Sequence, residues 1–359
     1  MKTALYLAAG AALALSACGQ KTETTSEAAG GGGGGNRAQV WAAGSSTVFP
    51  FATRVAENVA RTTGGKPARV ESLGTGGGFK LFCGGASAQY PDVATASRPI
   101  KKSEFDKCAA AGVTDIIEIK IGFDGIVVAN DKKGPTFDLH REQLYRALAA
   151  EVPKGAAFAP NTAKTWDAVG PGLPKDAILV YGPPPTSGTR DAFNELALEK
   201  GGEKDPTLAA LKKSDDEDFK AKTHTIRSDG LWIDSGENDN AIVQTLEKTP
   251  HSIGVFGYSF LENNMDKVKA AKIEGVAPTF ETISSGAYPL SRSMFIYVKK
   301  ASIGVTPGLR EFVDGFVSDA ATGKGGYLQS RGLIPLPEAE HKAQQAAVKA
   351  LTVMTAPAS

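Results

Sequence analysis

Four segments of the chain carry groups that could bind a small anion. Each combines small residues with Ser or Thr and stands at or just before the start of a predicted helix. They are residues 44–50 (GSSTVFP), 74–78 (GTGGG), 95–99 (TASRP) and 186–190 (TSGTR). The first amides of a helix lack an intrahelical acceptor and carry partial positive charge. Hydroxyl groups add donors and glycine permits close approach, so such segments can hold an oxyanion.

The spacing of these residue types favours binding over catalysis. A single Ser or Thr before a helix is usually only an N-cap. Residues 74–78 lack the Gly-Lys-Ser/Thr of a P-loop and the later acidic residue of a dinucleotide fingerprint. Ser187 has no His nearby in the sequence, and all four His residues lie outside the four segments. We therefore expect no catalytic residue and no cofactor.

Predicted strands and helices alternate along the chain. Strands are predicted at residues 39–43, 69–73, 92–96, 116–119, 125–129, 178–181, 253–258 and 294–298. Helices are predicted at residues 50–61, 141–150, 190–200, 241–247, 309–317 and 338–353, with a charged helical excursion at 201–222. This alternation is typical of an α/β fold with a largely parallel sheet. Segments that follow strands in such a sheet lie at the carboxyl ends of the strands, where ligands bind.

The composition is that of a globular protein with balanced charge. The 359 residues are 42% hydrophobic and 22% charged, with room for two or three domains. Forty Lys and Arg residues stand against 39 Asp and Glu residues, a net charge of +1, which argues against a general nucleic-acid binder. Three Cys and four His residues without a CxxC or HExxH motif leave little material for a metal site, so none is expected.

The N-terminal residues have the pattern of an export signal followed by a tether. Lys2 precedes an apolar run at 5–15 that is too short to span a bilayer. The sequence LSAC at 15–18 resembles the lipobox of bacterial lipoproteins. We expect residues 1–17 to be a signal peptide, Cys18 to be lipidated and the Gly-rich residues 18–36 to form a disordered tether. Ordinary signal cleavage with an incidental Cys18 is the alternative, and the mature chain is exported in either case.

Cys83 and Cys108 remain once Cys18 is set aside. Because an exported protein meets an oxidising compartment, we expect a disulfide between them. It would close a loop of about 25 residues and contribute about 3 kcal/mol in the chain-entropy description. The alternative is two buried free thiols.

Taken together and in this order, the segments resemble a known family. From residue 40 to residue 337 the chain is similar to the phosphate-binding proteins of bacterial phosphate-specific ABC transporters. Two further markers of the resemblance are residues 250–258 (PHSIGVFGY) and 288–292 (YPLSR). The resemblance implies the type II periplasmic binding protein fold, with two α/β lobes, a hinge and a ligand cleft. Lobe I would hold residues 37–123 and 285–359, and lobe II residues 124–284.

The resemblance also implies which residues contact phosphate. Thr47, the amide of Val48 and Thr75 match donor positions in lobe I, and the Ser-Gly-Thr at 187–189 matches the donors of lobe II. With their neighbours, the expected phosphate-binding residues are Ser46, Thr47, Val48, Thr75, Gly76, Ser97, Arg98, Ser187, Gly188, Thr189 and Arg190.

The chain departs from the family pattern at two positions. Many members have Asp where this chain has Arg98, and that Asp accepts the phosphate proton and so rejects sulfate. Many also have Arg where this chain has Pro183. We therefore expect Arg98 and Arg190 to supply the cationic contact, and either Asp124 or a residue within 229–240 to accept the proton.

The function that the resemblance implies is high-affinity extracytoplasmic binding of inorganic phosphate and its delivery to an inner-membrane ABC permease. The protein would be a monomeric lipoprotein of the periplasm, anchored to the membrane only by its lipid. Two alternatives remain at this point. One is a binding protein for sulfate, molybdate or a phosphonate, and the other is a secreted phosphate-ester hydrolase. An adhesin or a phosphate sensor on the same fold is a further possibility, since fold does not fix function.

Overall fold

The computed structural model describes residues 38–155, 157–236 and 238–358. The predicted signal peptide, the lipidation at Cys18 and the tether at 18–36 lie outside the described residues. No helix within the described ranges combines the length and the hydropathy that a membrane span requires.

A mixed sheet runs through the described residues. Its main path is β2 (Arg69–Ser72), β1 (Trp41–Gly44), β3 (Val93–Ala96), β13 (Ser291–Lys299), β4 (Ile116–Asp131), β10 (Ile253–Gly257), β8 (Val180–Gly182) and β9 (Trp232–Asp234), with β11 (Val268–Ala270) also paired to β4. Strand β1 is parallel to β2 and β3, and β8 is parallel to β9 and β10. Strand β13 is antiparallel to β3 and β4, and β4 is antiparallel to β10 and β11.

The prediction of a largely parallel sheet is therefore wrong. Residue patterns identify strands, but they do not give the direction of partners that are distant in the sequence. Strand β13 inserts between β3 and β4 from far along the chain, and it runs against both.

The two strands predicted at 116–119 and 125–129 are one strand, β4. Residues 120–124 look like an interruption, but Gly122 takes φ of 152° and keeps the strand continuous. A Cβ at this glycine would come within 2.7 Å of the Ile334 carbonyl oxygen. The pairing register with β13 shifts beside it, between Met294 and Phe295, as at a β-bulge. Strand β4 thus continues unbroken from its pairing with β13, at residues 116–125, to its pairing with β10, at residues 126–130.

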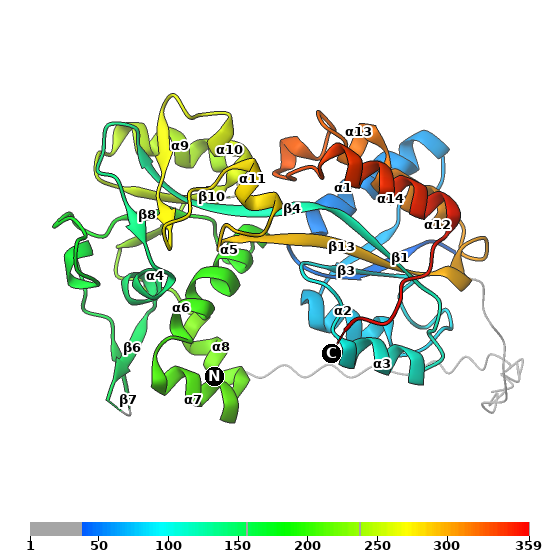
Figure 1. The fold of residues 1–359 in the computed structure, drawn as a ribbon, viewed down its shortest axis with the longest axis horizontal. Helices are drawn as coiled ribbons and strands as arrows, with labels where there is room; N and C mark the ends of the chain where they lie inside the picture. Colours follow the sequence, from blue (N-terminus) through cyan, green and yellow to red (C-terminus); the bar gives the residue numbers. More distant parts are fainter. Residues whose placement is uncertain (1–37, 156, 237, 359) are drawn as a thin grey trace, which may run out of the picture. The chain divides into compact units, whose positions relative to one another are not determined.

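Helices cover both faces of the sheet around β1 and β13. Helices α1 (Phe49–Thr63), α12 (Leu309–Val317), α13 (Asp319–Thr322) and α14 (Glu338–Ala350) lie on one face, and α2 (Gly74–Phe82) and α3 (Lys102–Ala110) on the other (Figure 1). Helix α14 ends three residues before its predicted end, because Leu351 adopts the left-handed region at φ of 51°.

The middle of the chain builds the other half around β8 and β10. Its helices are α4 (Arg141–Leu148), α5 (Gly188–Phe193), α6 (Lys200–Gly202), α7 (Pro206–Ser214), α8 (Asp216–His224), α9 (Asp239–Lys248), α10 (Tyr258–Glu262) and α11 (Phe280–Ser284). The helix predicted at 190–200 is divided, since a π-helical stretch, η2 (Asn194–Glu199), follows α5.

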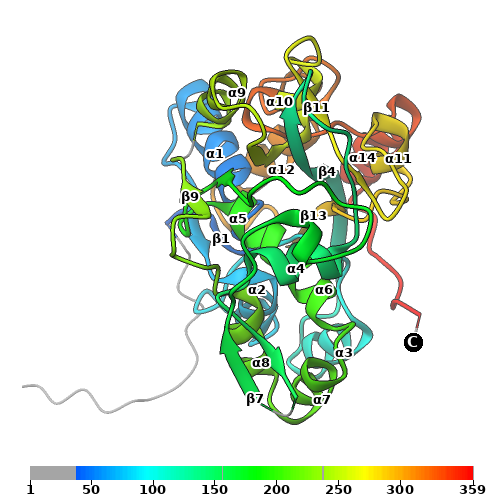
Figure 2. The ribbon, with the colours of Figure 1, turned by 90° about the vertical axis from the view of Figure 1, so that its left-hand side faces the viewer.

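Small elements complete this half. The predicted excursion at 201–222 is largely helical, and α7 and α8 lie beside the hairpin of β6 (Glu151–Lys154) and β7 (Ala157–Pro160) (Figure 1 and Figure 2). The short strands β5 (Asp138–Leu139) and β12 (Lys272–Ile273) pair with each other. Single 3-10 turns are η1 (Trp166–Ala168), η3 (Lys300–Ser302) and η4 (Gln329–Arg331).

Buried hydrophobic residues form separate cores. The first core lies between β1, β13 and helices α1 and α12, and it includes Val48 and Phe312. The second core lies around β8 and β10 and includes Phe193 and Trp166. A third, smaller core under α2 and α3 includes Phe79.

The predicted disulfide is confirmed: Cys83 at the end of α2 is bonded to Cys108 in α3, 25 residues later. We expect the double variant Cys83→Ser/Cys108→Ser to lose about 3 kcal/mol of unfolding free energy, because its unfolded chain is no longer closed into this loop. Denaturant titration measures the loss. A reducing agent should lower the denaturation midpoint of the unsubstituted protein to that of the variant, and it should leave the midpoint of the variant where it is. A variant with the same midpoint as the oxidised, unsubstituted protein would contradict the expectation.

Candidate functional site

The first three segments meet where β1, β2 and β3 end. The amide of Ser45 donates to the Thr95 carbonyl oxygen at 2.9 Å, and the amide of Leu73 donates to the Gly44 carbonyl oxygen at 2.8 Å. A Cβ on Gly78 would lie 2.4 Å from the Cα of Gly44, so only glycine lets α2 approach β1 this closely. The contacts bring segments 44–50, 74–78 and 95–99 to one edge of the sheet.

Residues 74–78 are the first residues of helix α2. The side chain of Thr75 turns to the neighbouring segment. Its Oγ1 lies 3.1 Å from Ser97 Oγ and accepts a hydrogen bond from the Ser97 amide at 3.1 Å. Gly76 follows in the same helix, where an added Cβ would meet nothing within 4 Å.

Segment 44–50 is anchored by burial of its own residues. Thr47 is 6% exposed, and Val48 belongs to the first core. The amide of Val48 donates to Ser45 Oγ at 3.4 Å, and Ser46 between them is half-buried. Helix α1 begins directly afterwards with Pro50 in its first turn, a favoured place for proline.

Segment 186–190 reaches across to segment 44–50. Ser187 caps α5 by accepting from the Thr189 amide at 3.2 Å. The Thr47 hydroxyl donates to the Gly188 carbonyl oxygen at 3.4 Å, and a Cβ on Gly188 would lie 2.8 Å from the Ser46 carbonyl oxygen. Two segments attached to different cores are therefore in direct contact.

Arg98 is held by α3, the helix that follows it. It forms paired 2.8 Å hydrogen bonds to Glu104, and its guanidinium lies 5.7 Å from the Phe79 ring centroid. Burial opposes ionisation of Glu104, but the hydrogen bonds and charge of Arg98 outweigh it and lower the pKa of Glu104. The positive charge of Arg98 is thus already matched by a carboxylate.

Arg190 is engaged in a similar way on the other side. Its Nη1 donates to the Pro183 carbonyl oxygen at 2.9 Å and to Asp234 Oδ1 at 3.0 Å. The guanidinium lies 4.6 Å from the ring centroid of Trp232, which stacks in turn on Phe193. Arg190 Nε is buried without a hydrogen bond.

The arginine that reaches the contact between the segments is Arg292, on β13. Its Nη2 donates to the Thr47 hydroxyl, and its Nη1 pairs with Glu195 Oε2. Its Nε lies 3.5 Å from Asp124 Oδ2. The Arg292 side chain is only 9% exposed. Sequence reasoning gave this residue no role, although it belongs to one of the markers quoted for the resemblance.

Asp124 lies opposite Arg292 in the pairing of β4 with β13. Its side chain is 11% exposed, and its Oδ2 is buried without a hydrogen bond. Burial raises the pKa of Asp124, while the charge of Arg292 opposes this. Two of the described carboxylates within 229–240 are engaged elsewhere: Asp229 pairs with Arg227 at 2.6 Å, and Asp239 Oδ2 accepts from the Gly257 amide at 3.0 Å.

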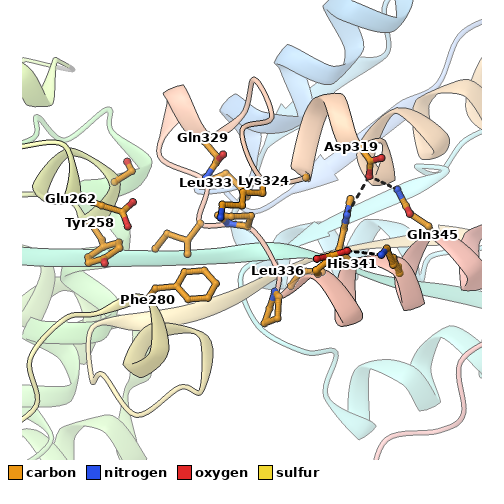
Figure 3. A pocket seen from close by; sticks show the side chains of 17 residues that line it. Tyr258, Glu262, Phe280, Asp319, Lys324, Gln329, Leu333, Leu336, His341 and Gln345 are labelled. Atoms are coloured by element: carbon orange, nitrogen blue, oxygen red, sulfur yellow. Dashed lines mark hydrogen bonds and ion pairs between the residues drawn. The ribbon is translucent and has the colours of Figure 1, made fainter.

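A cavity of about 770 Å³ lies in another part of the protein (Figure 3). It is lined from one side by Tyr258 and Phe280 and from the other by Lys324 and His341. None of the residues predicted to bind phosphate lines it.

Comparisons with known proteins agree with this architecture. Residues 29–320 match the PBP superfamily domain (PBP_like_2). The phosphate-binding protein PstS of Staphylococcus saprophyticus is 32% identical over 344 residues, covering 94% of this chain and 91% of that protein. Protein SphX of Synechococcus elongatus is 32% identical over 307 residues, covering 84% and 78%.

The same holds for solved structures. A possible phosphate binding protein from Planctomyces limnophilus is similar with a TM-score of 0.68 and 28% identity, covering 87% of this chain and 98% of that chain. The predicted fold class, a two-lobed α/β periplasmic binding protein fold, is confirmed. This chain belongs to the PBP superfamily, in the family that these phosphate-binding proteins represent.

Proposed function

We propose that the protein binds inorganic phosphate outside the cytoplasm and delivers it to an ABC permease. The observation that carries the proposal is the contact of Thr47 with Gly188 beside the guanidinium of Arg292. The predicted donors of segments 44–50 and 186–190, which are attached to different cores, come together there around a buried cation. Relatives named as phosphate-binding proteins support the identity of the anion.

The site would surround phosphate with uncharged donors and one arginine. Hydroxyls of Ser46, Thr47, Thr75, Ser97, Ser187 and Thr189, amides around Val48, Gly76 and Gly188, and the guanidinium of Arg292 form the donor set. Arg98 and Arg190 stay predicted contacts, but each already holds a carboxylate, Glu104 or Asp234. We therefore assign the main positive charge to Arg292.

Asp124 supplies the acceptor that the family pattern places at the position of Arg98. Phosphate carries a proton near neutral pH, and a carboxylate can accept it in a hydrogen bond. Sulfate carries no proton, so the same carboxylate repels it. Asp124 is next to Arg292 and has a buried oxygen without a hydrogen bond.

Binding is coupled to closure of two lobes about a hinge. Strand β4 passes from the first core, which holds Ile121, into the second, which holds Phe123 and Ile126. We place the hinge in β4 and β13 near Phe123, with lobe I at 37–123 and 285–359 and lobe II at 124–284. Closure brings segment 186–190 onto segment 44–50 and encloses the anion.

Delivery to the permease needs no chemistry on the ligand, so we propose a binding protein without enzymatic activity. It would act as a monomer held beside the membrane through a lipid on Cys18. The relatives from Staphylococcus saprophyticus and Planctomyces limnophilus are named for binding rather than for a reaction, which supports this proposal.

Isothermal calorimetry with phosphate, sulfate and molybdate tests the proposal. Charge-assisted hydrogen bonds contribute about 1.5–3 kcal/mol each against the cost of dehydrating the anion. We therefore expect phosphate to bind with a Kd near 1 µM, about −8 kcal/mol, and sulfate at least about 100-fold more weakly. Tighter binding of sulfate or molybdate would assign the site to another oxyanion, and turnover of a chromogenic phosphate ester would contradict the absence of catalysis.

A further inference from the structure

Two carboxylates and one hydroxyl surround the guanidinium of Arg292. Thr47 and Glu195 contact its two terminal nitrogens, and Asp124 lies 3.5 Å from Nε. The carboxylates differ in exposure, since the Glu195 side chain is 49% exposed and that of Asp124 is 11% exposed. Glu195 therefore reaches the buried guanidinium from the solvent side, whereas Asp124 belongs to the sheet.

The local backbone brings Glu195 to this place. Helix α5 begins with the predicted ligand residue Gly188, and the π-helical η2 continues it from Asn194 to Glu199. Short π-helical stretches inside helices are frequent at functional sites. Glu195 thus lies in the π-helical stretch that directly follows the helix of segment 186–190, and it meets an arginine 97 residues away in the sequence.

Arginine offers its terminal nitrogens to carboxylate and phosphate in the same planar geometry. Nη2 is in contact with Thr47, the residue that the proposed function assigns to phosphate, and the adjacent Nη1 is taken by Glu195. An anion that uses both nitrogens beside Thr47 must replace the Glu195 carboxylate at Nη1.

We propose that Glu195 is an internal competitor for the anion site: its carboxylate neutralises Arg292 when phosphate is absent, and phosphate displaces it on binding. The inference rests on the proposed function, and it deepens that function by naming a residue that sets affinity. A buried guanidinium without a full counter-charge is costly. Asp124 alone offers incomplete compensation, because its Oδ2 lies 3.5 Å from Nε and neither atom has a hydrogen bond. Displacing Glu195 therefore lowers the net affinity and aids release of phosphate.

The competing role for Glu195 is a latch that holds the closed form together. Both roles use the same contact with Arg292, but they predict opposite effects of removing the charge. Loss of a competitor strengthens phosphate binding, whereas loss of a latch or of a direct ligand weakens it.

Calorimetry with inorganic phosphate on the Glu195→Gln variant decides between them. We expect the Kd to fall about tenfold, and the dissociation rate measured by stopped flow to fall in step. Glu203→Gln is the matched control, because it removes a carboxylate shortly after η2 whose partners are Lys200 and Lys212 instead of Arg292.

An unchanged or raised Kd in Glu195→Gln overturns the inference while the proposed function stands, provided that the unsubstituted protein and Glu203→Gln bind phosphate. Failure of all three proteins to bind phosphate overturns the proposed function itself, and the inference with it. Because the Glu195 side chain is half exposed, the substitution leaves the buried cores intact.

Discussion

The Arg292→Gln variant should lose phosphate binding, with a Kd at least about 100-fold above that of the unsubstituted protein. Glutamine retains some hydrogen-bonding capacity but removes the positive charge and the forked donor geometry. Charge-assisted hydrogen bonds contribute about 1.5–3 kcal/mol each, so losing two of them amounts to two orders of magnitude or more. Calorimetry with phosphate measures the loss, and thermal unfolding shows whether the variant still folds.

Two comparisons make this result specific to Arg292. Arg310→Gln removes an arginine that pairs with Asp314 on the surface of α12, and it controls for the change in net charge. Arg98→Gln tests one of the two arginines that the sequence analysis predicted to supply the cationic contact to phosphate. A larger loss at Arg98 than at Arg292 would contradict the assignment made here, because it would show that phosphate draws Arg98 away from Glu104.

If Arg292→Gln fails to fold, Arg292→Lys keeps the charge beside Asp124 and remains informative. Lysine is a point charge that cannot reproduce the fork toward Thr47 and Glu195. We expect the lysine variant to fold and still to bind phosphate at least about tenfold more weakly. Unweakened binding by a folded lysine variant would show that only the charge matters at this position.

The four segments could be found from the sequence because their signal is local. Small residues, a hydroxyl and a following helix are visible within a few positions, and such segments after strands are expected at the carboxyl ends of the strands. The structure joins them through the contacts of Ser45 with Thr95, Thr75 with Ser97, and Thr47 with Gly188.

The role of Arg292 was not visible for the opposite reason. It depends on the register that sets Arg292 against Asp124, and on β13 lying between β3 and β4. The residue pattern within β13 does not predict its register with β4. The same long-range pairing makes the sheet mixed instead of largely parallel, and the bulge at Gly122 hides the continuity of β4.

The arginines inside the segments were predicted as phosphate contacts from the local sequence, but each one is already paired with a carboxylate of the protein. Arg98 and Arg190 carry the expected positive charge, but a sequence does not say which carboxylate each one faces. The partner of Arg98 could have been predicted, since Glu104 is the third residue of the helix that follows Arg98. In the structure, Glu104 also accepts a hydrogen bond from the Lys101 amide at 2.9 Å. A carboxylate that caps a helix beside an arginine is a natural partner for it.

Selectivity between phosphate and sulfate should depend on Asp124. The Asp124→Asn variant keeps the shape of the side chain but replaces an obligate acceptor with a group that can also donate. We expect phosphate to bind more weakly and sulfate more tightly, so that the ratio of their affinities falls at least about 100-fold, or about 2.7 kcal/mol. Calorimetry with each anion measures the ratio.

The ratio separates a role in selectivity from a structural one. If Asp124 only compensated the charge of Arg292, asparagine would change the affinity for both anions in the same direction and the ratio would hold. Asp229→Asn is the matched control, because Asp229 is a carboxylate from the other region considered for the proton acceptor and is held by Arg227. A ratio that changes in Asp229→Asn and stays constant in Asp124→Asn would move the acceptor to 229–240. The buried oxygen of Asp124 has no hydrogen bond and lies next to the guanidinium, which favours a role in selectivity, since a protonated oxyanion satisfies both groups at once.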